Sequence, residues 1–519
     1  MSGGTDVDVL VVGMGPTGVA LAGLLGLRGI RTAVFEKAED LYPLPRAVGM
    51  DHEVMRIAQE LGVVDELHDH VAPYRPSEYV GVHGELIRRF DQPPPPYRLG
   101  WPPMLVFDQP AFERVLRDRI RDMPEVQVFL GTEVTSFGQD ESIAWVDVVG
   151  ADAAARRVTG RYLVGCDGGS SLVRRDLGVG MQDLGFHEPW LVIDALVDDD
   201  AALARLPECN VQYCQPSRPG TYVRLIGRHR RWEISLEPDE LPVGPVDNDA
   251  AWTWLEHWIK PGEATIWRAA AYVFHGLVAE RWRYGRVFLA GDAAHMTPPF
   301  AAQGMAQGMR DAQNLAWKLT AVLAGQAADS LLDTYQRERR PHVVQTTLNT
   351  IELGRDICQR DVDLALVRDR KLLREAGGTV PTRVRGSLIP TLSDGLFATS
   401  TPGAGQICPQ PPVRAEGRVA LSDEVTGAGM RLFLAEDSNE SAVAALEKAL
   451  APIGGTVWSL RRLGEDEPVL SDWLADLPAV AALVRPDHCV YGTAGSLEDA
   501  QILVDQAVRR CLGRDPAVG

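Results

Sequence analysis

The chain has 519 residues, enough for two or three hydrophobic cores, because domains usually hold about 100 to 200 residues. Apolar residues make up 45% of it and charged residues 24%, which is typical of globular proteins rather than of disordered or disulfide-stabilised chains. The formal net charge of -19 disfavours nucleic acid and anionic membrane surfaces as partners, so small molecules are the better candidates.

The first predicted unit is a strand, a helix and a second strand over residues 7–36. Its glycine turn permits a tight connection, a close approach of backbone to a pyrophosphate, and close helix packing. The helix that follows presents unpaired N–H groups to phosphates. A carboxylate at the end of the second strand can accept hydrogen bonds from ribose hydroxyls. The candidate dinucleotide-binding residues here are Gly13, Gly15, Pro16, Thr17, Gly18, Glu36 and Lys37.

A second domain is expected to begin between residues 74 and 103, where proline enrichment favours an extended surface excursion rather than core. Residues 108–121 then show helical periodicity. From about 180 to 282 the pattern changes to alternating strands, for example 222–226 and 231–236. This pattern predicts a mostly antiparallel sheet inserted into the nucleotide-binding domain.

Two later turns favour a flavin over a nicotinamide as the bound cofactor. A buried strand at 162–165 runs into a turn that contains Asp167 and Arg174, and a second one at 287–290 runs into Gly291 and Asp292. The ribityl chain of FAD carries several hydroxyls and needs an acceptor such as the Asp292 carboxylate. Together with the glycine turn, these segments predict FAD.

The last part of the chain begins with a long predicted helix over residues 304–324, with Met305 on its apolar face and Gln307, Asp311 and Lys318 elsewhere. After about residue 390, strands and helices alternate as in a small α/β domain. The seven cysteines include no CxxC pair, so neither a metal site nor a redox dithiol is indicated. Reduced thiols, no recognisable secretion signal and no apolar stretch approaching about 18 residues lead us to expect a cytoplasmic protein.

With these three turns in this order, the chain resembles the class A flavoprotein aromatic hydroxylases, the group that includes p-hydroxybenzoate hydroxylase and phenol hydroxylase. Within the group it is most similar to 3-(3-hydroxyphenyl)propionate hydroxylases, through residues 44–49, 99–103 and 314–319. The likeness is strong over residues 5–345 and loose beyond them. It implies an α/β protein with a Rossmann-like FAD-binding domain (1–73, 104–180 and 283–392), an inserted, mostly antiparallel β-sheet substrate domain (74–103 and 181–282), and a C-terminal thioredoxin-like α/β domain without CxxC (393–519).

The resemblance implies roles for residues along the whole FAD molecule. Glu36 and Arg46 would hold its adenosine side, Gln109 would lie near the ribityl chain, and Asp292 would bind ribityl and pyrophosphate. Asp167 and Arg174 would belong to a segment associated with both FAD and the reduced nicotinamide.

The same resemblance places Pro298, Gln303, Gly304 and Met305 at the isoalloxazine ring. The positive end of the helix that starts near Gly304 would favour the anionic reduced flavin. The chain departs here from a common GGQG-type pattern, since it reads Ala-Ala-Gln-Gly over 301–304 and has alanine at 306 where asparagine is frequent. Contacts to the ring are therefore expected to differ from those of relatives.

The implied reaction is reduction of FAD by NADH or NADPH, formation of a C4a-hydroperoxyflavin from O2, and transfer of one oxygen atom to a phenol. The expected substrate is a 3-(3-hydroxyphenyl)propionate-like acid or a related phenol, and tailoring of a polycyclic aromatic natural product fits almost as well. No nucleic acid or membrane partner is expected, and a homodimer is compatible with this interpretation.

A base or proton relay should touch the phenol hydroxyl, because an ionised phenol is the better nucleophile. The candidate catalytic residues are Asp51, His52, Tyr272 and His275, together with Pro298 beside the ring. For the four titratable residues a structural hydrogen bond is the commoner role. Arg224, in a predicted strand, is the candidate partner of a substrate carboxylate.

Two other classes remain open at this point. A flavin-dependent halogenase shares the fold class, but its WxWxIP segment is only partly matched by Trp-Thr-Trp-Leu-Glu-His at 252–257. A non-catalytic flavin-binding protein would show no stimulation of NADH oxidation by phenols. A disulfide-type flavin reductase is disfavoured because the sequence has no paired redox cysteines.

Overall fold

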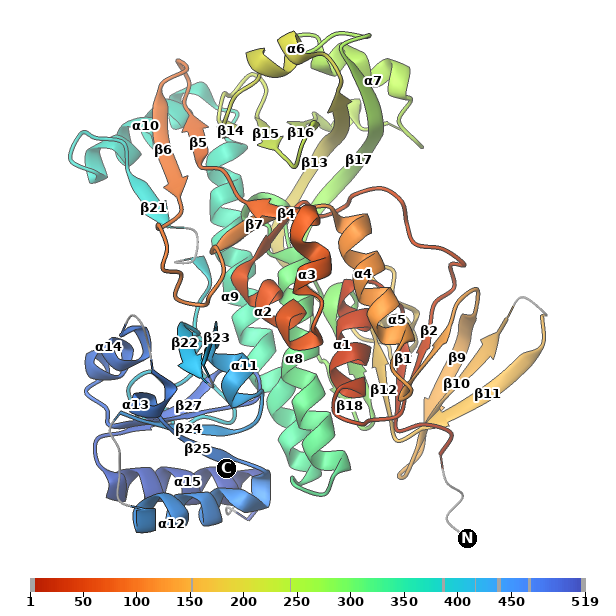
Figure 1. Cartoon of the computed structure of the whole chain (residues 1–519). Helices are drawn as coiled ribbons and strands as arrows, with labels where there is room; N and C mark the ends of the chain where they lie inside the picture. Colours follow the sequence, from red (N-terminus) through yellow and green to blue (C-terminus); the bar gives the residue numbers. More distant parts are fainter. Residues whose placement is uncertain are drawn as a thin grey trace.

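A six-stranded sheet in the order β18-β19-β12-β1-β2-β8 organises the N-terminal half of the computed structural model (Figure 1). The structure describes residues 5–150, 153–242, 244–384, 388–415, 417–435, 440–464 and 468–514. All neighbouring strands of this sheet are parallel except β18 at the edge. The strands are β1 (Val9–Val12), β2 (Thr32–Phe35), β8 (Val126–Phe129), β12 (Tyr162–Gly165), β18 (Arg283–Tyr284) and β19 (Val287–Leu289).

Helices cover this sheet, which is why its central strands are apolar and buried on both faces. Helix α1 packs against both α4 and α8, so it is apolar all round rather than amphipathic. The predicted helices at 108–121 and 304–324 agree with the structure to within one residue at each end. The helices of this half are α1 (Pro16–Gly26), α2 (His52–Leu61), α3 (Val64–Leu67), α4 (Gln109–Arg121), α5 (Leu172–Asp176) and α8 (Gly304–Leu323).

A nine-stranded sheet in the order β20-β17-β13-β16-β15-β14-β5-β6-β21 forms the upper part of Figure 1. Its central strands β17, β13, β16, β15 and β14 are antiparallel, as the alternating pattern predicted. Its strands are β5 (Ser77–Val80), β6 (Leu86–Asp91), β13 (Met181–Val197), β14 (Asn210–Tyr213), β15 (Gly220–Arg224), β16 (His229–Ser235), β17 (Ala264–Ala279), β20 (His295–Met296) and β21 (Thr382–Val384).

The proline-rich segment contributes β5 and β6 to this sheet, so the expectation of a surface excursion outside the core was wrong for these strands. Tyr79, Ile87 and Phe90 are buried there, in a core shared with Trp190 and Phe300. The prolines themselves, at 93–96, are exposed between β6 and β7. Around the sheet lie α6 (Asp200–Arg205), α7 (Asn248–Leu255), α9 (Asp333–Ile357) and α10 (Val362–Glu375).

Two small sheets complete the N-terminal part. One has the order β11-β10-β9 and the other β3-β7-β4, and the second lies beside α2 and α3 (Figure 1). Their strands are β3 (Gly49–Asp51), β4 (Val71–Pro73), β7 (Met104–Phe107), β9 (Glu133–Gln139), β10 (Ala144–Val149) and β11 (Ala155–Gly160).

The C-terminal part has a four-stranded sheet in the order β25-β24-β26-β27, in which β24 is parallel to β25 and antiparallel to β26. A hairpin of β22 (Pro412–Ala415) and β23 (Arg418–Leu421) precedes it. Its strands are β24 (Arg431–Leu434), β25 (Thr456–Ser459), β26 (Ala481–Val484) and β27 (Val490–Ala494). Its helices are α11 (Ser422–Thr426), α12 (Glu440–Leu450), α13 (Leu460–Leu463), α14 (Val469–Asp476) and α15 (Leu497–Cys511).

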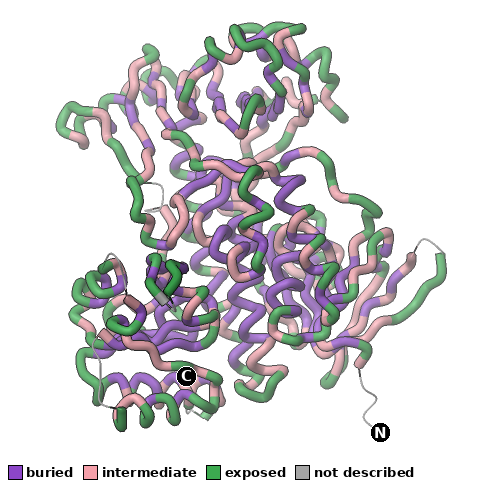
Figure 2. Tube along the Cα trace, viewed as in Figure 1, coloured by how far each residue is buried: buried purple, intermediate pink, exposed green. Residues whose placement is uncertain are grey.

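Burial is continuous from the six-stranded sheet through α8 and α9 to the C-terminal sheet (Figure 2). Trp317 and Leu331 join the core of the C-terminal part although they precede it in the chain. In the described residues, none of the helices is long and apolar enough to cross a membrane.

Candidate active site

The glycine turn between β1 and α1 packs closely against the loop after β12. Gly13 has a positive φ of 97°, and a Cβ atom there would clash with the carbonyl oxygen of Cys166. A Cβ at Gly18 would clash with the carbonyl oxygen of Gly13, whereas one at Gly15 would meet no described atom within 4 Å. Because α1 begins at Pro16, its unpaired N–H groups lie beside that open space. The turn therefore leaves room for a phosphate at the helix N-terminus.

Glu36 and Arg117 hold the turn from the end of β2 and from α4. The Glu36 carboxylate accepts hydrogen bonds from the N–H groups of Met14 at 2.9 Å and Ala38 at 3.0 Å. Arg117 donates to the Met14 carbonyl at 2.8 Å. Arg117 was not predicted, because nothing near it in the sequence marks its contact with residue 14. Lys37 is exposed beside this cluster.

Gln109 fixes the segment that carries Arg46. Its side-chain oxygen accepts the N–H groups of Arg46 at 2.9 Å and Ala47 at 2.5 Å, and its Nε2 donates to Glu113 at 2.6 Å. The Arg46 guanidinium is 55% exposed and lies 3.7 Å from Glu113. Burial raises the pKa of Glu113, against the opposing effects of Gln109, Arg46 and Arg117. Arg46 is therefore the exposed cation of this end of the site.

The Gly291–Ala293 turn follows β19 and is tied to the turn that contains Asp167. Asp167 accepts the N–H of Val173 at 3.1 Å, in the first turn of α5, and the hydroxyl of Ser171, the N-cap of that helix. Arg174 of that helix donates to the Ala293 carbonyl at 2.9 Å. Gly291 has a positive φ of 61°, a conformation that favours glycine. These contacts make Asp167 and Arg174 supports of the turn that presents Asp292.

Asp292 carries a carboxylate that no group of the described residues binds. The side chain is exposed, and among the described residues it has no hydrogen-bond partner. The protein around it nevertheless raises the pKa of its carboxyl by desolvation, with His295 and Arg46 acting in the opposite direction. The effect of Arg46 on this pKa indicates that the turn lies within electrostatic range of the segment that carries Arg46.

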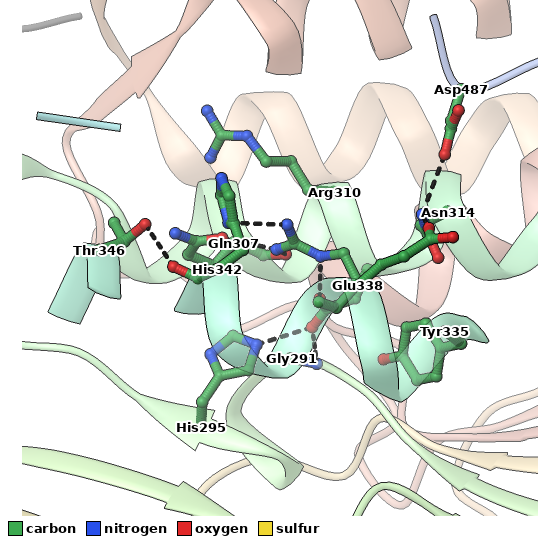
Figure 3. Close-up of polar contacts among 12 residues, drawn as sticks. Gly291, His295, Gln307, Arg310, Asn314, Tyr335, Glu338, His342, Thr346 and Asp487 are labelled. Carbon is green, nitrogen blue, oxygen red and sulfur yellow. Dashed lines mark hydrogen bonds and ion pairs between the residues drawn. The ribbon is translucent and has the colours of Figure 1, made fainter. Parts of the chain in front are cut away.

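Asp311 of α8 anchors the Asp292 turn through its backbone and through His295. It accepts hydrogen bonds from the N–H of Gly291 at 3.0 Å, from His295 Nε2 at 2.7 Å and from Arg339 Nε at 2.9 Å. Burial alone would raise the pKa of Asp311, but His295 and Arg339 outweigh burial and lower it. His295 is thus a structural member of the turn, and Figure 3 shows its ring pointing toward Gly291.

The N-terminus of α8 brings a third segment to the same place. Helix α8 begins at Gly304 with Gln303 as its N-cap, after a segment in which Pro298 is buried. Ala302, where the common pattern has glycine, adopts a left-handed φ of 55°. Cβ atoms at Gly308 or Gly291 would both clash with the hydroxyl of Thr17. The starts of α1 and α8 and the Asp292 turn therefore converge around one threonine.

Asp51, one of the candidate bases, is committed to structural contacts. Its carboxylate caps α2 by accepting the N–H groups of Glu53 and Val54, and it forms a short ion pair with Arg310. Gln303 donates to the same carboxylate at 3.2 Å. Burial would raise the pKa of Asp51, but Arg310 outweighs burial and the pKa is lowered. This carboxylate holds the α8 N-terminus in position and is not free to take a proton.

His52, the neighbouring candidate, lines a cavity of about 410 Å³ between α2, α8 and the C-terminal part, together with Arg98, Arg310 and His342. Burial lowers the pKa of the His52 imidazole. Asp51 and His52 are consecutive, so the sequence predicted both as candidate bases, but only Asp51 contacts Gln303.

Tyr272 and His275 lie on β17. The Tyr272 hydroxyl accepts a very short hydrogen bond from Arg268. His275 pairs with His187 at 2.8 Å, and burial followed by His187 lowers its pKa. Because residues 272 and 275 are separated by an odd number along a strand, their side chains point to opposite faces of the sheet. Tyr272 faces the same side as Trp190, which it opposes on β13.

Arg224 lies on the face of the nine-stranded sheet that points away from the FAD-binding motifs. Its neighbours Val223 and Leu225 pack against Val106 of β7, whereas Tyr222, on the same face as Arg224, joins the core under α7. The Arg224 guanidinium pairs with Glu208. The sequence could not decide its face, because alternation predicts two faces but not which one meets the neighbouring domain.

The opposite face carries an ion-pair cluster that sequence reasoning missed. Arg231 donates to both carboxylate oxygens of Asp194 at 2.8 and 2.9 Å and to the carbonyls of Pro45 and Arg46 at 2.9 Å. Arg268 donates to the Pro45 carbonyl at 2.6 Å. Burial would raise the pKa of Asp194, but Arg231 and His229 lower it to about 2. This cluster fastens the sheet onto the segment that carries Arg46.

Comparison with known proteins agrees with this geometry. The FAD binding domain model matches residues 6–350, and the HcaD C-terminal domain model matches residues 405–509. A probable NADH-specific resorcinol 4-hydroxylase of Rhodococcus jostii (strain RHA1) is 39% identical over 95% of this chain and 93% of its own length. A 3-(3-hydroxy-phenyl)propionate/3-hydroxycinnamic acid hydroxylase of Mycobacterium sp. (strain JLS) is 34% identical over 94% of this chain and 89% of its own.

Among solved structures, aklavinone-11 hydroxylase in complex with FAD and aklavinone superposes with a TM-score of 0.78 at 25% identity, covering 99% of this chain and 100% of its own. The chain belongs to the FAD-binding domain family. It is an FAD-dependent aromatic monooxygenase, as the resemblance of its three turns predicted.

The residues present fit FAD. The open space at Gly15, the exposed Arg46 guanidinium, and the free Asp292 carboxylate are groups that a phosphate and a polyhydroxylated chain would satisfy. The positive end of α8 at Gly304 suits an electron-rich ring system.

Proposed function

We propose that the protein hydroxylates a small phenol in the space between the nine-stranded sheet and the start of α8, with NADH as the reductant. The observation that carries this proposal is the convergence of the Asp292 turn, the starts of α1 and α8, and the sheet face that carries Asp194 and Arg231. When bound, FAD would accept electrons from the reduced nicotinamide and transfer one oxygen atom of O2 to the phenol. The names of the similar hydroxylases, which include resorcinol and 3-(3-hydroxy-phenyl)propionate as substrates, support a phenol.

The chain's own residues would bind and orient the cofactor. The turn at Gly13, Gly15 and Gly18, with Pro16 and Thr17 at the start of α1, would hold the pyrophosphate. Residues further along would hold the rest of the molecule: Glu36, Lys37 and Arg46 the adenosine side, Gln109 and Asp292 the ribityl region, and Pro298, Gln303, Gly304 and Met305 the ring. Asp167, Arg174 and Gly291 would support the Asp292 turn, as their contacts suggest.

The architecture that we propose keeps the predicted domain boundaries. A Rossmann-like domain is supported by the parallel order β19-β12-β1-β2-β8, and an inserted substrate domain by the nine-stranded sheet, most of which lies between β12 and β19 in the chain. A thioredoxin-like C-terminal domain is supported by the order β25-β24-β26-β27. A cytoplasmic location suits an enzyme that consumes NADH and has seven free cysteines, and a homodimer is its proposed assembly.

The test is the visible spectrum of the purified protein, followed by oxidation of NADH and NADPH with and without a panel of phenols. We expect bound FAD, NADH oxidation stimulated by a phenol, and a hydroxylated product in preference to hydrogen peroxide. Bound FAD without response to any phenol would refute the proposed reaction and leave the family assignment intact.

We expect Asp292→Asn to weaken FAD binding by roughly 10- to 100-fold, because a hydrogen bond to a charged group contributes about 1.5–3 kcal/mol. The ratio of flavin to protein absorbance after dialysis, and titration of the apoprotein with FAD, measure the effect. Asp239→Asn, at an exposed carboxylate in the segment after β16, is the matched control. Equal FAD retention by both variants would show that Asp292 does not contact the cofactor.

A further inference from the structure

One row of side chains crosses the nine-stranded sheet on the face that meets the FAD-binding motifs. The pairing of β17, β13, β16, β15 and β14 aligns Ala270, Val192, Glu233, Thr221 and Gln212 opposite one another. Directly paired residues of neighbouring strands point to the same face of a sheet. The row is therefore a strip with two apolar members at one end and three polar members at the other.

The side chains two residues away along each strand point to the same face, so their contacts show what this strip faces. On one side, Asp194 and Arg231 bind the backbone at residues 45 and 46. On the other side, Trp190 packs against Phe300, with ring centroids 5.6 Å apart, just after Pro298. The strip thus faces the interval between the Arg46 segment and the segment that leads into α8.

Glu233 is the charged member of the strip and has little to bind within the protein. It is 8% exposed, and its nearest cation, Arg231 Nη1, lies 3.8 Å from Oε1, beyond hydrogen-bond distance. Among the described residues no hydrogen bond to its carboxylate is found. Burial raises the pKa of Glu233, with Arg231 acting against it. A buried carboxylate without donors is unusual and indicates a ligand that supplies them.

The neighbours of Glu233 extend the polar surface without adding charge. Thr221 donates its hydroxyl proton to Gln212 Oε1 at 2.7 Å, and both side chains are buried. This bond orients the Gln212 amide, and its Nε2 has no partner among the described residues. The strip therefore offers a carboxylate acceptor and an amide donor at its polar end.

The arginines of this face use most of their donors within the protein, although the buried Nε of Arg268 has no hydrogen-bond partner among the described residues. Arg231 donates hydrogen bonds to Asp194 and to the carbonyls of Pro45 and Arg46. Arg268 is bound to the Pro45 carbonyl and to Tyr272. An acidic substrate would meet the Glu233 carboxylate beside two cations that already lie within ion-pair distance of Asp194, and a poorly paired buried charge is costly.

We propose that the substrate is an uncharged arene with at least two hydroxyl groups, and that Glu233 binds it by accepting a hydrogen bond from one of them. This inference rests on the proposed hydroxylation of a phenol. The strip would hold the apolar edge of the ring over Val192 and Ala270 and its hydroxyls over Glu233 and Gln212. A hydroxyl bonded to a carboxylate makes the ring a better nucleophile for the oxygen transfer. Phenols with a carboxylate side chain would be rejected by the same group.

The test compares resorcinol with 3-(3-hydroxyphenyl)propionate as substrates of the FAD-containing enzyme and of its Glu233→Gln variant. The wild type should hydroxylate resorcinol with the higher kcat/KM. In Glu233→Gln, kcat/KM for resorcinol should fall roughly 10- to 100-fold, the equivalent of one hydrogen bond to a charged group. The KM for the acid should fall at the same time, since the repelling charge is gone. A purely structural role for Glu233 would raise both KM values.

Glu208→Gln is the matched control, because Glu208 pairs with Arg224 on the opposite face of the same sheet, and its side chain is 82% exposed. It should leave both substrates unaffected. Gln212→Leu is a second variant that keeps the carboxylate and removes the amide donor, and it should weaken resorcinol binding even if Glu233→Gln does not fold. A wild-type preference for the acid, or unchanged resorcinol kinetics in a folded Glu233→Gln, would overturn the inference. If no phenol is hydroxylated at all, the proposed function itself fails.

Discussion

Replacing Gly15 by alanine is expected to leave the protein folded but poorly able to retain FAD. Gly18→Ala should lose both its folding stability and its ability to bind FAD. At Gly15 a Cβ meets no described atom within 4 Å, so the apoprotein has space for it. That space is where the phosphates would approach the start of α1, and an added methyl group there would cost about 1–3 kcal/mol of cofactor binding. At Gly18 the Cβ clashes with the backbone of Gly13, which cannot move without shifting β1 or α1.

The two variants are compared with the wild type by urea unfolding of the apoproteins and by titration with FAD. We expect Gly15→Ala to match the wild type in urea and to bind FAD roughly 10- to 100-fold more weakly. Gly18→Ala should unfold at a clearly lower urea concentration and bind little FAD. Normal FAD affinity in Gly15→Ala would mean that the pyrophosphate does not lie at this turn.

The glycine turn could be predicted because its requirements are local. Gly13, Gly15 and Gly18 are close in sequence, and the strand and helix on either side are short-range patterns. Asp292 was predicted on the same grounds, as a carboxylate in a turn directly after a buried strand. The structure adds that this carboxylate is unpaired within the described residues and lies within electrostatic reach of Arg46.

Long-range pairing explains what the sequence could not provide. Asp51 was predicted as a base because it is an acidic residue near the Arg46 turn, but its partner Arg310 lies 259 positions later. Glu233 was not singled out, because its importance comes from its register opposite Val192 and Thr221. Helical periodicity likewise separated Asp311 and Lys318 from the apolar face of α8, yet both are fully buried because partners surround that helix.

Glu338→Ala is expected to destabilise the protein by about 3–5 kcal/mol, because it leaves buried cations without their partner. Glu338 of α9 accepts hydrogen bonds from Lys318 at 2.7 Å, from Arg485 at 2.7 and 2.9 Å, and from the N–H of Leu396 at 2.9 Å. Asn314 donates to the same carboxylate at 2.8 Å, and Figure 3 shows it between Glu338 and Asp487. These contacts join α8 and α9 to the C-terminal part, so limited proteolysis should release that part more readily in the variant.

Arg337→Gln is the control, since Arg337 is the preceding residue of the same helix and its ion pair with Asp394 is more than half exposed. Its loss should cost less than about 1 kcal/mol, as is usual for surface pairs. Urea unfolding of the FAD-containing enzymes compares the two variants. Similar losses in both would contradict the assigned role of the buried cluster.

The pH dependence of the Glu338→Ala defect gives an independent check. Burial lowers the pKa of Lys318 to about 8, although Glu338 acts to raise it. Between that value and the unfolded pKa near 10.4, the unfolded chain binds more protons than the folded one, so the contribution of Lys318 to stability increases with pH. Without Glu338 the pKa of Lys318 in the folded protein should fall further, so the increase in stability with pH should begin below pH 8. The stability difference from the wild type should therefore be smaller at pH 9 than at pH 7, and a difference that is constant or larger at pH 9 would show that Lys318 is not the cation left unpaired.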